Sequence, residues 1–63
     1  MNINLPFLTC DKDDVFAVGP LVGEHVGYYY FIVYLVGPRE IRIYETDINR
    51  LDAKRKQLTD LLT

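Results

Sequence analysis

The sequence predicts a small α+β fold, a β-β-β-α meander whose antiparallel sheet carries one C-terminal amphipathic helix packed on one face. Three observations support this prediction. Residues 26–36 form an apolar run rich in β-branched and aromatic side chains, which is typical of a buried strand and too short for a membrane-spanning helix. A Gly-Pro turn signal and an alternating segment, 41–45, follow the run. Beyond them, apolar residues recur at helical spacing.

A chain of 63 residues is long enough for one domain, 1–63. It lies near the lower limit for folding alone, since a domain of this size buries only about 60% of its unfolded surface. Such domains usually gain stability from a disulfide, a metal or a partner subunit. One cysteine and one histidine exclude an intrachain disulfide and a four-ligand zinc site built by a single chain. We therefore expect no metal and no cofactor, and we expect a homo-oligomer.

The N-terminal third predicts short strands joined by turns. Residues 2–9 alternate apolar and polar side chains until Pro6, whose missing N–H restricts the segment to an edge strand or an extended arm. Residues 11–14, Asp-Lys-Asp-Asp, predict a turn, and 15–18 predict a strand that a Gly-Pro pair ends. The glycine-rich connection that follows predicts a continuation of that strand as far as Val22.

Residues 26–36 predict the central strand, and a loop at 37–39 predicts its hairpin with 41–45. In this register Val33 lies opposite Ile43. One face of the hairpin then carries only apolar side chains: Phe31, Val33, Leu35, Ile41 and Ile43. The opposite face, which we call the tyrosine face, carries Tyr28, Tyr30, Ile32, Tyr34, Arg42 and Tyr44. A slip of one residue would mix the two sets, which is why this register is favoured.

The last segment predicts a helix that Thr46 or Asp47 caps. Its apolar stripe, at three- and four-residue spacing, contains Ile48, Leu51, Arg55, Leu58 and Leu62. Packing this stripe on the apolar face of the hairpin predicts an intrachain core of Phe31, Val33, Leu35, Ile41, Ile43, Leu51, Leu58 and Leu62. Arg55 interrupts the stripe, so its guanidinium is expected to reach the edge of the sheet or to pair with a carboxylate such as Glu45.

The tyrosine face is the first candidate site, because tyrosine offers a large contact area with a polar tip and is enriched at protein interfaces. In the predicted register Arg42 lies opposite Tyr34, within reach of a cation–π contact. Three roles stay open: an interface with a second copy or another protein, stacking of single-stranded nucleic acid, and ordinary cross-strand packing on a half-exposed face. The net charge of −2 disfavours nucleic acid, so we expect an interface.

The remaining candidate residues have simpler explanations. The acidic turn at 11–14 resembles a calcium loop only superficially, because it lacks the following glycine and the distal glutamate. Cys10 and His25 could act together only if the fold placed them side by side. Six of the seven basic residues follow Gly37. Those in the predicted helix are spread around it, which indicates a solvated surface rather than a phosphate site.

These observations predict a small non-enzymatic protein-interaction module. We expect a cytoplasmic homo-oligomer, most simply a twofold dimer joined through the tyrosine face or a free strand edge, that binds an unidentified protein as an accessory or inhibitor. A compact, acidic chain without catalytic motifs suits the accessory proteins that viruses and mobile elements encode. The N-terminus lacks the charged start and apolar core of a signal peptide, and no membrane association is expected. Single-stranded nucleic-acid binding through the tyrosine face is the alternative.

Overall fold

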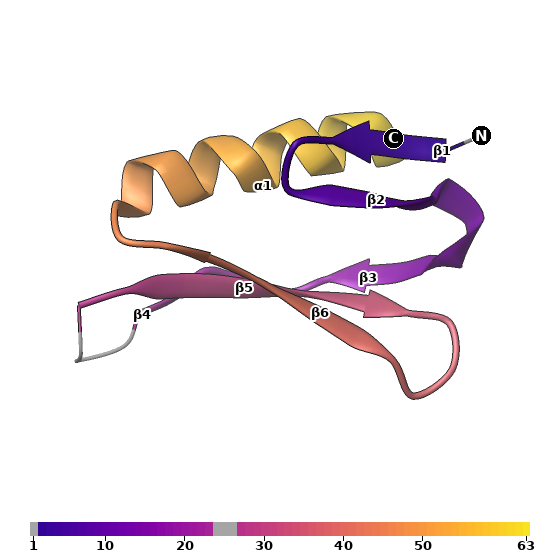
Figure 1. The fold of residues 1–63 in the computed structure, drawn as a ribbon, viewed down its shortest axis with the longest axis horizontal. Coiled ribbons are helices and arrows are strands. Elements are labelled where there is room, and N and C mark those ends of the chain that lie inside the picture. Colours follow the sequence, from indigo (N-terminus) through magenta and orange to yellow (C-terminus); the bar gives the residue numbers. More distant parts are fainter. Residues whose placement is uncertain (1, 24–26) are drawn as a thin grey trace.

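The computed structural model describes residues 2–23 and 27–63, which fold into two layers (Figure 1). One layer is an antiparallel sheet, and the other consists of a helix and a separate β-hairpin. The sheet has β5 (Tyr29–Leu35) at its centre, β6 (Glu40–Glu45) along one side, and β3 (Val15–Val18) and β4 (Val22–Gly23) along the other. The predicted α+β meander is thereby confirmed, with its first strand divided into two pieces.

The outer strand formed by β3 and β4 is divided because Pro20 has no N–H to donate to the ladder. Immediately before it, the Gly19 N–H donates to the Ile32 carbonyl oxygen at 2.7 Å. Further upstream, Phe16 is the extra residue of a β-bulge, and a bulge bends the strand that contains it. This edge of the sheet is therefore irregular.

The hairpin of β5 and β6 forms in a register that differs from the predicted one. Val33 lies opposite Ile41 rather than Ile43. The Leu35 N–H donates to the Arg39 carbonyl oxygen at 3.0 Å, so the loop begins one residue earlier than predicted and turns at a glycine with φ of 87°. The pairing is shifted by two residues. A shift of two leaves every side chain on its predicted face, since the side-chain period of a strand is two.

Helix α1 (Ile48–Leu62) packs against the apolar face of the sheet. Asp47, one of the two predicted caps, accepts the Asn49 N–H on Oδ1 at 2.8 Å. This bond satisfies one of the backbone donors that a helix start leaves unpaired. Leu51 and Leu58, two turns apart on one side of the helix, are fully buried against the sheet.

Residues 2–11 form a hairpin, where the sequence predicted a single edge strand or an extended arm. Its strands are β1 (Asn2–Leu5) and β2 (Leu8–Asp11). Pro6 lies in the turn between them, where its missing N–H removes no ladder hydrogen bond. The hairpin lies beside α1 over the same face of the sheet (Figure 1).

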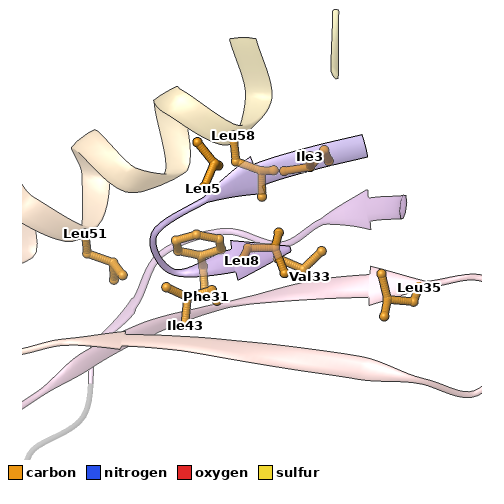
Figure 2. Close-up of a cluster of buried hydrophobic side chains, with 9 residues drawn as sticks. All are labelled: Ile3, Leu5, Leu8, Phe31, Val33, Leu35, Ile43, Leu51 and Leu58. Atoms are coloured by element: carbon orange, nitrogen blue, oxygen red, sulfur yellow. The ribbon is translucent and has the colours of Figure 1, made fainter. Parts of the chain in front are cut away.

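One contiguous core fills the space between the layers, and Figure 2 shows its side chains converging from the sheet, the helix and the hairpin. Most of the predicted core is buried, namely Phe31, Val33, Leu35, Ile43, Leu51 and Leu58. Ile41 and Leu62, also predicted, are only partly buried at its border, and Ile48 of the predicted stripe is 42% exposed. The hairpin adds three residues that the prediction omitted: Ile3, Leu5 and Leu8.

Candidate functional site

The tyrosine face is the side of the sheet that points away from α1 and the N-terminal hairpin. Strand side chains alternate between the two faces, and the residues between the face-lining ones, Phe31 and Val33, are fully buried in the core. Tyr30, Ile32 and Tyr34 of β5 therefore point outward. Both elements of the second layer lie on the core side (Figure 1), so in the described residues no helix or strand covers the tyrosine face.

An aromatic cluster occupies one end of the tyrosine face. Tyr44 lies opposite Tyr30 in the ladder, and their ring centroids are 5.7 Å apart with planes inclined at 48°. The Tyr28 ring meets the Tyr44 ring edge-on, at 5.3 Å and 68°. Tilted and edge-on arrangements are the ones that aromatic pairs prefer. The strand pairing thus holds three rings in one cluster at the surface.

Arg42 joins this cluster through Tyr30, which corrects the predicted contact with Tyr34. In the observed register Arg42 lies opposite Ile32, and its guanidinium carbon is 5.4 Å from the centroid of the Tyr30 ring. That distance falls within the range of a cation–π interaction. Interaction with the Tyr44 side chain raises the pKa of Arg42 above its ordinary value, which agrees with the permanent charge of a guanidinium in proteins.

Tyr34 occupies the other end of the face and lies against Gly19 of the neighbouring strand. A Cβ placed on Gly19 would be 3.4 Å from Tyr34 Cε2 and 3.3 Å from the Ile32 carbonyl oxygen. The absence of a side chain at Gly19 therefore gives the tyrosine ring a shallow place on the sheet. Tyr34 remains 38% exposed, so its ring lies against Gly19 and is still accessible to a binding partner.

Residues of β3 and β4 complete the face, and sequence reasoning did not assign them to it. Val22 lies opposite Tyr30, and Ala17 lies opposite Tyr34. Paired residues of an antiparallel ladder share a face, so both belong to this surface. Their assignment depends on the bulge and on the Gly-Pro break, and no local alternation of the sequence reveals where those irregularities fall.

The electrostatics of the tyrosine face are close to neutral. Its cation, Arg42, lies 3.7 Å from Glu40, and both side chains are about half exposed. Exposed ion pairs of this kind contribute little stability. The four basic residues of the helix lie in the other layer, and three of them contact groups of the same chain, Lys56 through Asp52 at 3.2 Å. Lys54 contacts Glu45 at 3.0 Å, and the Arg55 Nε donates to the Gly19 carbonyl oxygen at 2.8 Å.

Arg55 therefore follows the first of its two predicted courses, in which the guanidinium reaches the edge of the sheet, and the alternative pairing with Glu45 is wrong. Its stem crosses the core side of the sheet, and its guanidinium satisfies the carbonyl that precedes Pro20. Glu45 pairs with Lys54 instead. The hydrogen bond from Lys54, and a second one from the Thr46 N–H, lower the pKa of Glu45.

The other candidates from the sequence do not form a reactive cluster in the part of the chain that the structure describes. The acidic turn is a short 3₁₀ helix, Lys12–Asp14, in which the Asp13 N–H donates to Asp11 Oδ1 at 3.0 Å. Burial, and then the charges of Asp14 and Asp11, raise the pKa of Cys10, which disfavours its thiolate. His25, the other member of a possible pair with Cys10, lies outside the described residues.

Within residues 2–23 and 27–63, metal-ligand clusters, pockets and membrane-spanning helices are all absent. No three His, Cys, Asp or Glu side chains of these residues come together as metal ligands. The same residues enclose no pocket. Of the helical segments described, none is long and apolar enough to cross a bilayer. The tyrosine face is consequently the surface whose composition calls for a functional explanation.

Comparison with known proteins found no matching protein-family model, no curated protein of detectable similarity and no solved structure with a matching fold.

Proposed function

We propose that this chain is a small non-enzymatic interaction module, a homo-oligomeric accessory or inhibitor protein that acts by binding another protein through its tyrosine face. The observation that carries the proposal is the position of α1 and the N-terminal hairpin on one side of the sheet. Both cover the core side (Figure 1), which leaves an aromatic surface on the opposite side. Contiguous exposed apolar patches beyond a few hundred Å² are rare on monomers and usually mark interaction sites.

The composition of this face suits a protein partner. Tyrosine and arginine are the side chains most enriched among residues that dominate binding energy at protein interfaces. The rings of Tyr28, Tyr30 and Tyr44 are already held against one another, so a partner does not have to order them. Preorganised side chains lose less conformational entropy on binding. A protein surface with an apolar centre and a few hydrogen-bonding groups is the matching ligand.

Nucleic acid is the less favoured ligand because the face has too little positive charge. Platforms for single-stranded nucleic acid combine stacking rings with a basic groove. Here Arg42 is stacked on Tyr30 and adjoins the carboxylate of Glu40. The edge-on contact of Tyr28 with Tyr44 also turns those two rings away from a common stacking plane.

The cytoplasm is the compartment that we propose for this protein, since its one cysteine is a free thiol and free thiols persist in reducing compartments. A role as an accessory or inhibitor of the kind that viruses and mobile elements encode is part of the same proposal. It is supported by the small size of the chain, 63 residues, and by a surface suited to covering another protein.

The experiment compares substitutions on the two layers. The full chain is used to capture binding proteins from host extract, these are identified by mass spectrometry, and direct binding of each purified partner is measured by calorimetry. Tyr34→Glu should weaken binding at least tenfold, because a carboxylate would become buried without a partner. Leu61→Glu is the matched control, since Leu61 lies on α1 and is 37% exposed against 38% for Tyr34. Equal effects of the two substitutions would contradict the proposal.

A labelled single-stranded oligonucleotide tests the alternative in parallel. Binding that weakens steeply with added salt and is lost on Tyr34→Glu would show that the face is a nucleic-acid platform and would overturn the protein-binding proposal.

A further inference from the structure

The second edge of β6 is the longest uninterrupted free strand edge among the residues that the structure describes, six residues against four in each strand of the N-terminal hairpin. β6 pairs with β5 on one side, and its six residues contain no glycine, proline or bulge. The opposite edge of the sheet is interrupted by the bulge at Phe16 and by Pro20. The Gly19 carbonyl oxygen on that side of the sheet already accepts a hydrogen bond from Arg55 Nε. A free, regular strand edge is a template for pairing with a further strand.

The hydrogen-bond pattern shows which backbone groups this edge offers. Antiparallel ladders alternate between residues that bond to their neighbour and residues that point away from it. The bond from the Leu35 N–H to the Arg39 carbonyl oxygen sets this alternation for the β5–β6 ladder. The carbonyl of Ile32, which receives the Gly19 N–H, accordingly points away from β6. In β6 the outward residues are therefore Glu40, Arg42 and Tyr44.

We propose that β6 pairs with β6 of a second copy about a twofold axis, with Ile41 opposite Ile41 and Glu40 of each copy opposite Arg42 of the other. Glu40 and Arg42 would each exchange two backbone hydrogen bonds with their opposite residue. The pairing joins the sheets of the two copies edge to edge. It depends on the self-association part of the proposed function and not on which partner the tyrosine face binds, although Arg42 belongs to both surfaces.

Charge complementarity selects this register among those that keep tyrosine face beside tyrosine face. Centring the axis on Arg42 would place two arginines directly opposite each other, and like charges in that position are destabilising. Centring it on Ile43 would place Ile41 opposite Glu45, whose carboxylate is already bound to Lys54. Centring it on Ile41 creates two opposite-charge pairs.

The side chains concerned are available for this pairing. The contact of Arg42 with Glu40 within one chain is long, at 3.7 Å, and both groups are about half exposed, so little stability is lost when this ion pair is exchanged for one with the second copy. Ile41 is a predicted core residue that the single chain buries only partly. Pairing with a second Ile41 would remove more of its apolar surface from water.

The edge pairing gives the tyrosine face a particular arrangement. A twofold axis perpendicular to the sheet places both tyrosine faces on the same side of one continuous sheet. Two copies of the partner, or two repeats within it, could then be bound at once, and linked binding raises the overall affinity without new contacts.

The test exchanges the two charges and measures dimerisation by analytical ultracentrifugation. Glu40→Arg gives a chain with two positive groups at the edge, and Arg42→Glu gives a chain with two negative groups. Each variant alone should dimerise roughly tenfold to a hundredfold more weakly than the unmodified chain, because two opposite-charge pairs become two like-charge pairs. An equimolar mixture of the two variants should form a heterodimer, and the double variant should regain the unmodified affinity.

Arg50→Glu on α1 is the control for net charge, since it changes the charge as Arg42→Glu does without altering the sheet edge, and it should leave dimerisation unchanged. Amide exchange adds a backbone measurement: the Arg42 N–H should be protected at high protein concentration and exposed on dilution. The inward-pointing Ile43 N–H should stay protected at both concentrations.

Two results would overturn the edge pairing. A dimer that tolerates Glu40→Arg but dissociates on Tyr34→Glu would place the self-contact on the tyrosine face; the proposed self-association would stand and the edge pairing would fall. An unmodified chain that is monomeric at hundreds of micromolar would contradict both the proposed self-association and the edge pairing. Binding of another protein by the tyrosine face would still be tested separately by the calorimetry described above.

Discussion

Replacing Leu58 with alanine should remove a large share of the stability of this fold. The Leu58 side chain is fully buried and joins the helix to the sheet and the N-terminal hairpin (Figure 2). Truncating a leucine in such a position costs about 2–5 kcal/mol, because apolar contacts are lost and a cavity remains. A chain of 63 residues has a total stability of about 3–9 kcal/mol. The substitution should therefore lower the melting temperature by at least about 8 °C.

Leu61→Ala is the matched control for this measurement. Leu61 lies three residues further along the same helix and is 37% exposed, so the same atoms are removed from a surface position. Alanine also has the higher helix propensity, which partly offsets the lost contacts. Urea unfolding followed by circular dichroism should give a change below about 1 kcal/mol for this variant. Equal losses for the two leucines would refute the packing of α1 described above.

Three further substitutions test contacts that lie outside the core centre. Cys10→Ser should keep the fold and partner binding, and an obligatory disulfide-linked dimer on a non-reducing gel of freshly purified protein would contradict this. The pKa of Glu45 is lowered in the folded state by Lys54. The ion pair of Glu45 therefore contributes its full stability above the unfolded-state pKa of about 4.3. This contribution is lost as the pH falls through the lower pKa of the folded state. Glu45→Gln should therefore reduce stability at pH 7 and flatten its acid dependence in urea melts, and an unchanged slope would exclude the ion pair. Arg55→Met should cost about 1–3 kcal/mol, because it leaves the Gly19 carbonyl without its charged donor, and thermal melts that do not shift would show that water replaces the guanidinium.

The division of the sheet into an apolar face and a tyrosine face could be predicted because it depends only on alternation. The register could not, since pairing Val33 with Ile41 or with Ile43 separates the same two sets of side chains. The predicted contact of Arg42 with Tyr34 failed for this reason, although both residues remained on the predicted face. A hydrophobic pattern excludes registers that are shifted by one residue but does not distinguish registers that differ by two. The geometry of the turn decides between the latter.

The N-terminal hairpin was not predicted because Pro6 was interpreted as interrupting a single strand, whereas it lies in the turn between two strands. Proline is excluded from the middle of a ladder but is favoured in turns, so the same residue supports both interpretations. The contributions of Ala17 and Val22 to the tyrosine face were missed because they depend on a bulge and a chain break. Such irregularities arise from how β3 and β4 fit against β5, which no local pattern encodes.

The meeting of Ile3, Leu5 and Leu8 with Leu58 in one core has a consequence for synthesis on the ribosome. The apolar strand β5 is made before the helix that covers it, and elongation at about 5–20 residues per second leaves an interval of roughly one to five seconds between Phe31 and Leu58. The core cannot close before Leu58 is available, so β5 waits for the helix before it can be buried on both the hairpin side and the helix side. Packing of the two layers is therefore expected to follow the synthesis of α1 in one step, rather than to accompany the synthesis of β5.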